Sequence, residues 1–462
     1  GLSVRDAGLS ISRAKGAVDS EILGTAALVA AYNAELTAHN LIDFDDLLVE
    51  VHSLIGHNEQ ARQLLNRRYQ HILIDEFQDT SELQWRLVQL LRGSDSVFVI
   101  GDPKQSIYSF RGASRDMFAV FAADFPIHHL VTLDTNYRSR PQIVQIANAI
   151  FPKSDTLVPY QQSAGAVQAM QTLNEFTEAD AVLETIEQGI GGSDLLKATS
   201  DSAGNQFSDF AIIYRTHRAV RHVQQRLYDA GIPYQVVGEG SPYERPEYKA
   251  IIQSLVWLQN KQELPRISGF SPGQVQIILQ GIDKTQPVSQ VAQQIATGLV
   301  LAGDDPKKQI DLAQLIGTLV RFDTRPDSLA AYLAYVDELS RQDFYDSRAD
   351  AVTLLTIHAS KGLEFSHVVL IAAEEGILPH MRKTEPTNID EERRLFYVAA
   401  TRAKQQLTII SAKKRAGMPV QISRFVRDIS ADILPRIIDS HMSTAEKRIK
   451  HRQQKARQAT LF

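Results

Sequence analysis

The chain has 462 residues, a length that predicts about three domains, and its 44% hydrophobic and 22% charged residues are typical of folded globular proteins. No stretch approaches the ~20 unbroken apolar residues of a membrane-spanning helix, and the absence of cysteine excludes disulfides, thiolate metal sites and a cysteine nucleophile. The formal net charge of −5 averages over local patches, so it neither supports nor excludes binding of nucleic acid. We therefore expect a cytoplasmic protein with no membrane partner.

Helices are expected first along the chain and strands after them. Apolar residues recur at helical spacing from Val18 to Leu65, which predicts packed helices. Short, apolar, β-branched runs then alternate with polar turns and helical patterns, which predicts parallel sheets that bind ligands at the carboxyl ends of their strands. Between Arg245 and Asp350 the pattern is helical, without a strong strand. The predicted strands are 71–74, 96–100, 129–133, 210–214, 351–357, 367–373 and 406–412.

The stretch HILIDEFQDT places two adjacent acids, Asp75 and Glu76, directly after an apolar predicted strand. This is the layout of a Walker B element, in which the first acid holds Mg²⁺ and the second orients or deprotonates an attacking water. Adjacent acids at a strand end also occur in ordinary solvent-facing turns, so the pair alone leaves both interpretations open.

Five stretches, in order, resemble the motifs of superfamily 1 DNA helicases of the UvrD/Rep/PcrA type. DEFQDT at 75–80 is similar to motif II, GDPKQSIYSFRGA at 101–113 to motif III, and TLDTNYRS at 132–139 to motif IV. TIHASKGLEF at 356–365 is similar to motif V, and EERRLFYVAATRAK at 391–404 to motif VI. Each follows a predicted strand or opens a helix, as a two-lobed motor requires. The resemblance covers nearly the whole chain.

The resemblance implies an ATP site that uses Mg²⁺. Hydrolysis of a γ-phosphate concentrates negative charge in the transition state, and Arg138 and Arg402 match the family's two γ-phosphate arginines. Asp75 matches the family's metal-binding acid, Glu76 its catalytic acid and Gln105 its sensor glutamine. Tyr137 matches the ring that stacks on adenine, Glu364 the acid that accepts a ribose hydroxyl, and Gly362 a glycine of the nucleotide site.

Aromatic residues in the motif III stretch indicate a track for single-stranded DNA. Tyr108 and Phe110 are followed by Arg111, and rings that stack on bases beside a cation that pairs with phosphate suit a sequence-tolerant track. The family often carries Trp where this chain has Phe110, so a weaker grip is expected. His358 matches a family residue at the DNA and coupling face. The implied partners are single-stranded DNA and its junctions with duplex DNA.

One element of the family pattern is absent. The GxxxxGK[ST] loop, with which such motors hold the β- and γ-phosphates, does not occur in the 462 residues. The family places this loop well upstream of motif II, so we interpret the chain as starting inside the first lobe. We expect this chain to hydrolyse ATP poorly or not at all, because the lost phosphate contacts are worth several kcal/mol.

The C-terminal stretch is basic, and its last five residues, QATLF, resemble the peptide that docks replication and repair proteins onto the bacterial sliding clamp. Gln458 would be the polar anchor, while Leu461 and Phe462 would fill an apolar pocket. A frayed, solvated terminus is the alternative interpretation.

The resemblance implies an α/β fold with two RecA-like parallel-sheet lobes of the P-loop NTPase type, the first incomplete, and with helical insertions. The expected segments follow in chain order. They are a helical accessory segment (1–48), the C-terminal part of the first lobe (49–135), the first half of the second lobe (136–245), a helical insertion (246–350), the second half of the second lobe (351–430), and a basic flexible tail (431–462).

The expected function is that of an ATP-dependent 3′–5′ DNA helicase or translocase acting in repair, recombination or replication. Among enzymes, the rival is the motor part of an AddA/RecB-type helicase-nuclease, which DPKQSIY and TIHASKGLEF also suit. Outside enzymes, the rival is a non-catalytic DNA-binding or clamp-tethered adaptor that has lost its phosphate loop. A native N-terminus without GxGKT would favour the adaptor.

Overall fold

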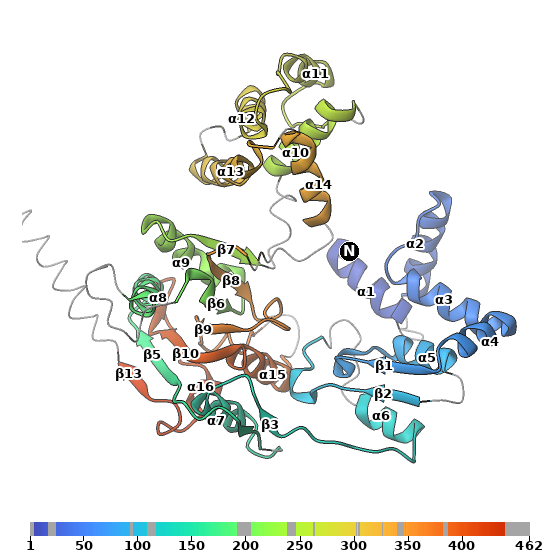
Figure 1. Cartoon of the computed structure of the whole chain (residues 1–462), viewed down its shortest axis with the longest axis vertical. Coiled ribbons are helices and arrows are strands. Elements are labelled where there is room, and N and C mark those ends of the chain that lie inside the picture. Colours follow the sequence, from blue (N-terminus) through green and yellow to red (C-terminus); the bar gives the residue numbers. More distant parts are fainter. Residues whose placement is uncertain are drawn as a thin grey trace, which may run out of the picture. The chain divides into compact units, whose positions relative to one another are not determined.

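Figure 1 shows a computed structural model of the chain, which forms two compact units. The first unit comprises Gly1–Ala181 and Ser360–Phe462, and the second comprises Val182–Ala359. None of the helices among the described residues is both long and apolar enough to span a bilayer. The structure describes residues 4–16, 25–92, 96–108, 117–154, 156–191, 205–237, 246–261, 264–301, 303, 305–325, 327–339, 346, 348–381 and 387–438.

The first unit begins with four helices. The Lys15 ammonium lies 2.7 Å from the Asp43 carboxylate and 2.6 Å from that of Asp46, and its side chain is almost fully buried, so this contact fastens the first helix to the start of the third. Asn58 caps the fourth helix by accepting a hydrogen bond from the Ala61 amide at 3.0 Å. The helices are α1 (Val4–Gly16), α2 (Ala26–Ala38), α3 (Asp46–His57) and α4 (Glu59–Arg68).

A small parallel sheet follows, in which β1 (His71–Ile74) pairs with β2 (Ser96–Val99). One face of this sheet packs on a cluster built around Phe77 and Trp85, whereas the other face leaves Leu73 74% exposed and Phe98 57% exposed. These two strands are therefore packed on one side only. The surrounding elements are η1 (Phe77–Asp79), α5 (Glu82–Leu91), η2 (Pro103–Gln105) and α6 (Met117–Asp124).

The larger sheet of the first unit has the strand order β13-β5-β10-β9, and all of these pairs are parallel. Its apolar strands are buried, and α7 and α15 pack on them and on each other (Figure 1). The bounds are β3 (Thr135–Asn136), α7 (Pro141–Ile150), β4 (Val158–Pro159), β5 (Ala166–Thr172), α8 (Glu175–Ile190), β9 (Phe365–Leu370), α15 (Ile389–Ala400), β10 (Ala403–Ala412), β11 (Lys414–Arg415), β12 (Met418–Pro419), α16 (Arg424–Arg427) and β13 (Arg436–Ile438).

The second unit contains three parallel strands in the order β6-β8-β7, and a group of helices. Five of the helices enclose their own apolar core, in which Ile251, Leu255, Val291 and Ile295 are fully buried. The bounds are η4 (Phe207–Asp209), β6 (Phe210–Tyr214), α9 (His217–Asp229), β7 (Tyr234–Val237), α10 (Pro246–Asn260), α11 (Pro272–Gln280), α12 (Val288–Gly298), α13 (Pro306–Leu319), η6 (Val320–Phe322), α14 (Ser328–Leu339) and β8 (Val352–Thr356).

The predicted α/β fold with parallel RecA-like sheets and helical insertions is confirmed, and the first sheet has two strands among the described residues. Six of the seven predicted strands are present within a few residues of their predicted bounds. The strand at 129–133 is wrong. Its residues form no ladder, and Leu130 and Val131 are 81% and 77% exposed, because no strand in the described ranges lies beside it to accept its backbone hydrogen bonds.

Candidate active site

The adjacent acids Asp75 and Glu76 lie in a tight turn at the carboxyl end of β1. Glu76 has a φ of 50°, a left-handed conformation that is unfavourable for a residue with a side chain, and its amide donates to the Asp75 carboxylate at 2.8 Å. The turn is fixed because the Phe77 amide donates to the Ile100 carbonyl at 3.0 Å, beside the end of β2. The turn leaves both acidic side chains exposed.

The two carboxylate oxygens of Asp79 have different surroundings, and the Lys361 ammonium contacts one of them. Lys361 contacts one Asp79 oxygen, lies 3.1 Å from the Glu76 carboxylate and donates to the Gln105 carbonyl at 3.0 Å. The other Asp79 oxygen is buried without a hydrogen-bond partner. Burial raises the pKa of Asp79, although Lys361 opposes this shift. Lys361 therefore joins the motif V stretch to the acids that follow β1.

Gln78 joins the motif II stretch to the motif III stretch. Its amide oxygen accepts from the Asp102 backbone amide at 3.0 Å, and its carbonyl accepts from the Ser106 hydroxyl at 3.1 Å. Gly101 leaves room for this contact, because a Cβ at this position would lie 2.2 Å from the Gln78 side-chain oxygen and 3.0 Å from the Phe77 backbone nitrogen. The two predicted motifs thus form one connected structure.

Arg402 is a buried cation whose acceptors are all uncharged. Its guanidinium donates to the carbonyls of Val398 at 2.9 Å and Leu363 at 3.2 Å, and to the side-chain oxygen of Gln105 at 3.2 Å. Only 2% of the residue is exposed. Burial, together with the nearby Arg138, lowers the pKa of Arg402 to about 10, so it remains charged at neutral pH. A buried cation held by neutral oxygens is a favourable place for an anionic ligand.

Helix α15 supports the Gln105 side chain through a short relay. The Gln105 amide donates to the Asp102 carboxylate at 3.0 Å, and the Tyr397 hydroxyl donates to the same oxygen at 3.4 Å. Burial and the Asp102 charge raise the pKa of Tyr397. Arg394 donates to the Ser106 carbonyl at 2.5 Å. These contacts hold the motif III stretch against the helix that precedes Arg402.

A second set of charges surrounds Glu364. The Arg138 guanidinium lies 2.6 Å from one Glu364 oxygen, and the Lys404 ammonium lies 3.0 Å from the other. The hydrogen bond from Lys404, with the charge of Arg138, lowers the pKa of Glu364 below its ordinary value. The structure thus brings together the predicted γ-phosphate arginine and the predicted ribose-binding acid.

The predicted adenine ring, Tyr137, is 65% exposed and packs against Tyr160, with ring centroids 4.8 Å apart. Gly362 has a φ of 83°, which favours glycine in the turn between Lys361 and Glu364. Lys361 also lies 5.5 Å from the centre of the Tyr108 ring, so Tyr108 adjoins the acids that follow β1.

Several predicted DNA and clamp residues lie in the second unit or outside the described residues. His358 belongs to the second unit. The motif III residues Phe110 and Arg111, and the clamp-peptide residues Gln458, Leu461 and Phe462, lie outside the described residues.

Sequence reasoning missed several residues of the site, among them Lys361, Tyr397, Arg394 and Tyr160. Lys361 lies in the quoted motif V stretch, and Tyr397 and Arg394 lie in motif VI, so a search for cations and hydroxyls in the motifs would have found them. Tyr160 lies in no motif, and only the structure reveals it.

The site suits a metal ion that arrives with a nucleotide. Among the described residues, no group of three or more His, Asp or Glu side chains is close enough to hold a metal ion alone. Mg²⁺ in phosphate sites uses one or two carboxylates and completes its shell with phosphate oxygens and water. The exposed Asp75 carboxylate fits that single-ligand role.

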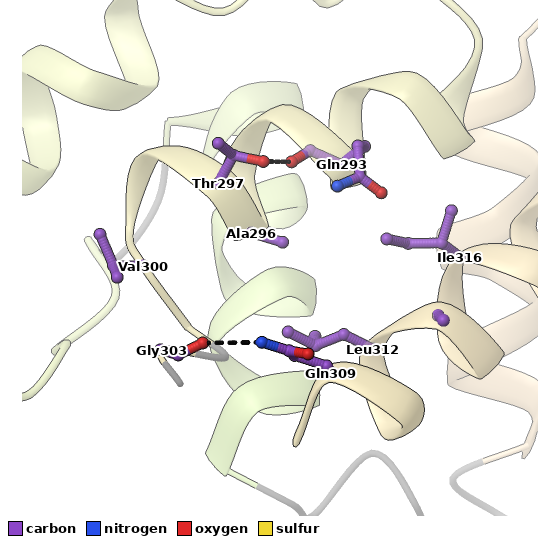
Figure 2. A pocket seen from close by; sticks show the side chains of 9 residues that line it. Gln293, Ala296, Thr297, Val300, Gly303, Gln309, Leu312 and Ile316 are labelled. Atoms are coloured by element: carbon purple, nitrogen blue, oxygen red, sulfur yellow. Dashed lines mark hydrogen bonds between the residues drawn. The ribbon is translucent and has the colours of Figure 1, made fainter. Parts of the chain in front are cut away.

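A pocket of about 370 Å³ lies elsewhere, in the second unit, beside α12 and α13 (Figure 2). Its lining contains no charged side chain. Gln309 donates across its edge to the Gly303 carbonyl at 3.1 Å, and Thr297 donates to the Gln293 carbonyl at 2.9 Å. A triphosphate would find no cation among the residues that line this pocket.

Comparison with known proteins finds one family. The model of the UvrD/REP helicase N-terminal domain matches residues 7–126, and that of the UvrD-like helicase C-terminal domain matches residues 131–268 and 275–414. ATP-dependent DNA helicase UvrD1 of Mycobacterium tuberculosis is 30% identical over 87% of this chain and 63% of its own length. The corresponding values are 28%, 90% and 72% for Rep of Escherichia coli, and 28%, 88% and 64% for PcrA of Bacillus subtilis.

The chain therefore spans 63% of the length of UvrD1 and a similar share of the other two relatives. The matched regions include the turn after β1, the Gln105 relay and Arg402. On these matches, the chain belongs to the UvrD-like family of DNA helicases.

Proposed function

We propose that the protein is an ATP-dependent helicase or translocase that moves 3′ to 5′ on single-stranded DNA and separates duplex ahead of it. The observation that carries this proposal is the buried Arg402 guanidinium, which has only uncharged acceptors and is bonded to Gln105. A γ-phosphate would supply the anion that this arginine lacks. The relatives UvrD1, Rep and PcrA are ATP-dependent DNA helicases, which supports the same reaction.

Each residue has a defined task in this proposal. Arg402 and Arg138 stabilise the charge that develops on the γ-phosphate, and Gln105 senses that phosphate through its bond to Arg402. Glu76 orients the attacking water and accepts its proton. Asp75 would hold the Mg²⁺ that accompanies the nucleotide, and that ion would supply neutralisation of phosphate charge. Tyr137 stacks on the adenine, and Glu364 accepts a hydrogen bond from a ribose hydroxyl.

Nucleotide binding requires existing ion pairs to open. Arg138 is bonded to Glu364, so it must leave that acid to reach a phosphate, and Lys404 then compensates the Glu364 charge alone. Glu76 is paired with Lys361, which also touches Asp79 and lies near the Tyr108 ring. A change of partners at Lys361 would therefore couple the nucleotide to the aromatic residue that we assign to DNA.

The absence of a phosphate loop from the 462 residues limits nucleotide binding and hydrolysis by this chain alone. Because the 462 residues contain no GxxxxGK[ST] segment, the chain lacks the amides and the lysine that hold the β- and γ-phosphates. We infer that it binds nucleotide weakly and hydrolyses it poorly without such a segment ahead of residue 1. Robust ATP turnover by the 462-residue chain would contradict this inference.

The test compares the 462-residue chain with a form in which a GxxxxGK[ST] segment precedes Gly1. The extended form is expected to hydrolyse ATP when single-stranded DNA is present, and to unwind duplexes with a 3′ tail but not a 5′ tail. Arg402→Gln in the extended form should lower kcat at least about 100-fold, because a transition-state cation is lost. The matched control is Arg62→Gln on the surface of α4, which should leave kcat unchanged.

The adaptor remains the second candidate, because the chain lacks the phosphate loop. An extended form that binds single-stranded DNA but neither binds nor hydrolyses ATP would favour it. The clamp-binding peptide at Gln458, Leu461 and Phe462 stays a prediction under either function, as do the helicase-nuclease alternative and a role in repair, recombination or replication.

A further inference from the structure

A short parallel ladder places two exposed tyrosines side by side at the edge of the candidate site. Thr135 and Asn136 of β3 pair with Val158 and Pro159 of β4, and the next residue on each strand is a tyrosine. The Tyr160 amide donates to the Asn136 carbonyl at 2.9 Å. The ladder therefore fixes the positions of Tyr137 and Tyr160 relative to each other.

Packing in a core does not explain this pair. Tyr137 is 65% exposed and Tyr160 is 64% exposed, so neither ring is part of a buried core. The ring centroids are 4.8 Å apart and the planes are inclined by 38°. The side-chain amide of Gln161 also donates to the Tyr137 carbonyl at 3.2 Å, which adds a second restraint on the same backbone.

The spacing decides how such a pair could bind a planar ligand. A base inserted between two rings needs about 7 Å between them, twice the ~3.5 Å contact distance of stacked carbon atoms. At 4.8 Å the two rings leave no such gap. Tyr160 therefore covers one face of Tyr137, and a ligand can stack only on the opposite face.

The position of the pair indicates which ligand this is. Tyr137 immediately precedes Arg138, which is held 2.6 Å from Glu364, and these two residues are assigned above to phosphate and ribose. A ring beside a ribose-binding acid lies where the base of a nucleotide would be.

We propose that Tyr160, which lies in no helicase motif, is a positioning residue for the nucleotide base. It holds the Tyr137 ring in a fixed orientation and leaves one face open to the purine of ATP. This inference rests on the proposed function, because it requires Tyr137 to bind the base. It adds a residue that acts through Tyr137 and is not itself in contact with the nucleotide.

The experiment measures binding of ATP and of inorganic triphosphate to the 462-residue chain. Labelled tyrosine rings followed by NMR report weak binding, and the ratio of the two affinities isolates the contribution of the base and ribose. Tyr160→Ala should weaken ATP binding about 5- to 10-fold, as expected for partial loss of one stacking contact, and leave triphosphate binding within about 2-fold. Tyr160→Phe should behave like the wild type, because it retains the ring.

Two further variants complete the design. Tyr228→Ala removes another half-exposed tyrosine, at the end of α9, and should change neither affinity. If Tyr160→Ala does not fold, Tyr160→Leu keeps an apolar side chain after β4 but no ring, and it should lose the preference for ATP in the same way.

The outcomes separate this inference from the function on which it rests. If Tyr137→Ala leaves ATP binding unchanged, the assignment of Tyr137 to the base fails. If Tyr137→Ala weakens ATP binding but Tyr160→Ala and Tyr160→Leu do not, only the role of Tyr160 is overturned. An equal loss of ATP and triphosphate binding in the Tyr160 variants would also overturn it, because that result reports damage to the whole site.

Discussion

Two clusters of the first unit, each with one cation between two carboxylates, differ in how completely their partners are fixed. The Arg415 cluster consists of Glu178, Glu374 and Arg415, and the two acids are 1% and 0% exposed. Arg415 donates to both acids at 2.6 to 2.7 Å. The backbone amides of Ala372 and Ala412 each donate to one acid as well.

The Lys361 cluster consists of Glu76, Asp79 and Lys361, and it is incomplete by comparison. Glu76 is 54% exposed, and one oxygen of Asp79 is buried without a partner. Both clusters follow the carboxyl ends of parallel strands, where ligands of such sheets collect. A closed cluster stabilises the fold, whereas an open one can exchange its cation for a ligand. The difference lies in the satisfied hydrogen bonds, because the charges are the same in number and sign.

Removal of the cation from the closed cluster should have the largest effect. Arg415→Met leaves two buried carboxylates without a counter-ion and should lower the free energy of unfolding by about 3–5 kcal/mol. Urea titration measures this loss. The matched control is Arg424→Met, which removes a 35% exposed arginine from the 21% exposed Glu375 and should cost about 1 kcal/mol or less. Equal losses in the two variants would remove the distinction between closed and open ion pairs.

The sequence predicted six strands of the structure and the helicase motifs, but not the Arg415 cluster. Glu178 lies in the first turn of α8, where an acid ordinarily faces solvent and interacts with the helix dipole. Its burial depends on Ala372 and Arg415, about 200 residues away along the chain. No local pattern records that contact.

Local patterns also explain the errors in the strand predictions. The stretch at 129–133 has strand-forming residues, yet a strand requires a neighbour, and its composition does not show whether one is present. Conversely, β5 was not predicted, because its sequence AVQAMQT contains two glutamines. In the structure β5 pairs with β10 on one side and with β13 on the other. The candidate site was more predictable than the sheet, because Glu76, Gln105 and Arg402 are marked by motifs.

The closed cluster should also make stability depend on pH. Burial raises the pKa of Glu178 to about 7, from an ordinary value of 4.5, so the folded protein retains a proton that the unfolded chain releases between these values. Stability from this group is therefore present below pH 4.5 and is lost as the pH rises to about 7, by roughly 3 kcal/mol.

The measurement compares the wild type with Glu178→Gln, which cannot titrate, by urea unfolding at a series of pH values. The difference between the two free energies should shift in favour of the glutamine variant as the pH rises from 4.5 to 7, and then become constant. A difference that does not change with pH would show that Arg415 keeps Glu178 ionised throughout.

Of the two clusters, the Lys361 cluster should lose less stability when its cation is removed, and it should then bind another cation in its place. Lys361→Met leaves Glu76 able to turn toward solvent but removes the cation from the partly buried Asp79, so the free energy of unfolding should fall by about 1–2 kcal/mol, less than in Arg415→Met. Mg²⁺ binds one or two carboxylates readily when water completes its shell, and Asp75 is an exposed acid beside this cluster. Mg²⁺ at about five times its dissociation constant would restore about 1 kcal/mol.

Urea unfolding of Lys361→Met with and without millimolar Mg²⁺ tests this exchange, and Arg415→Met is the comparison. Mg²⁺ should stabilise the Lys361 variant more than the wild type and should not stabilise the Arg415 variant, because a hydrated ion cannot enter a site whose acids are 0% and 1% exposed. Rescue of both variants would mean that general ion binding is being measured. Rescue of neither would mean that the acids after β1 do not form a metal site without phosphate, which leaves Asp75 dependent on the nucleotide.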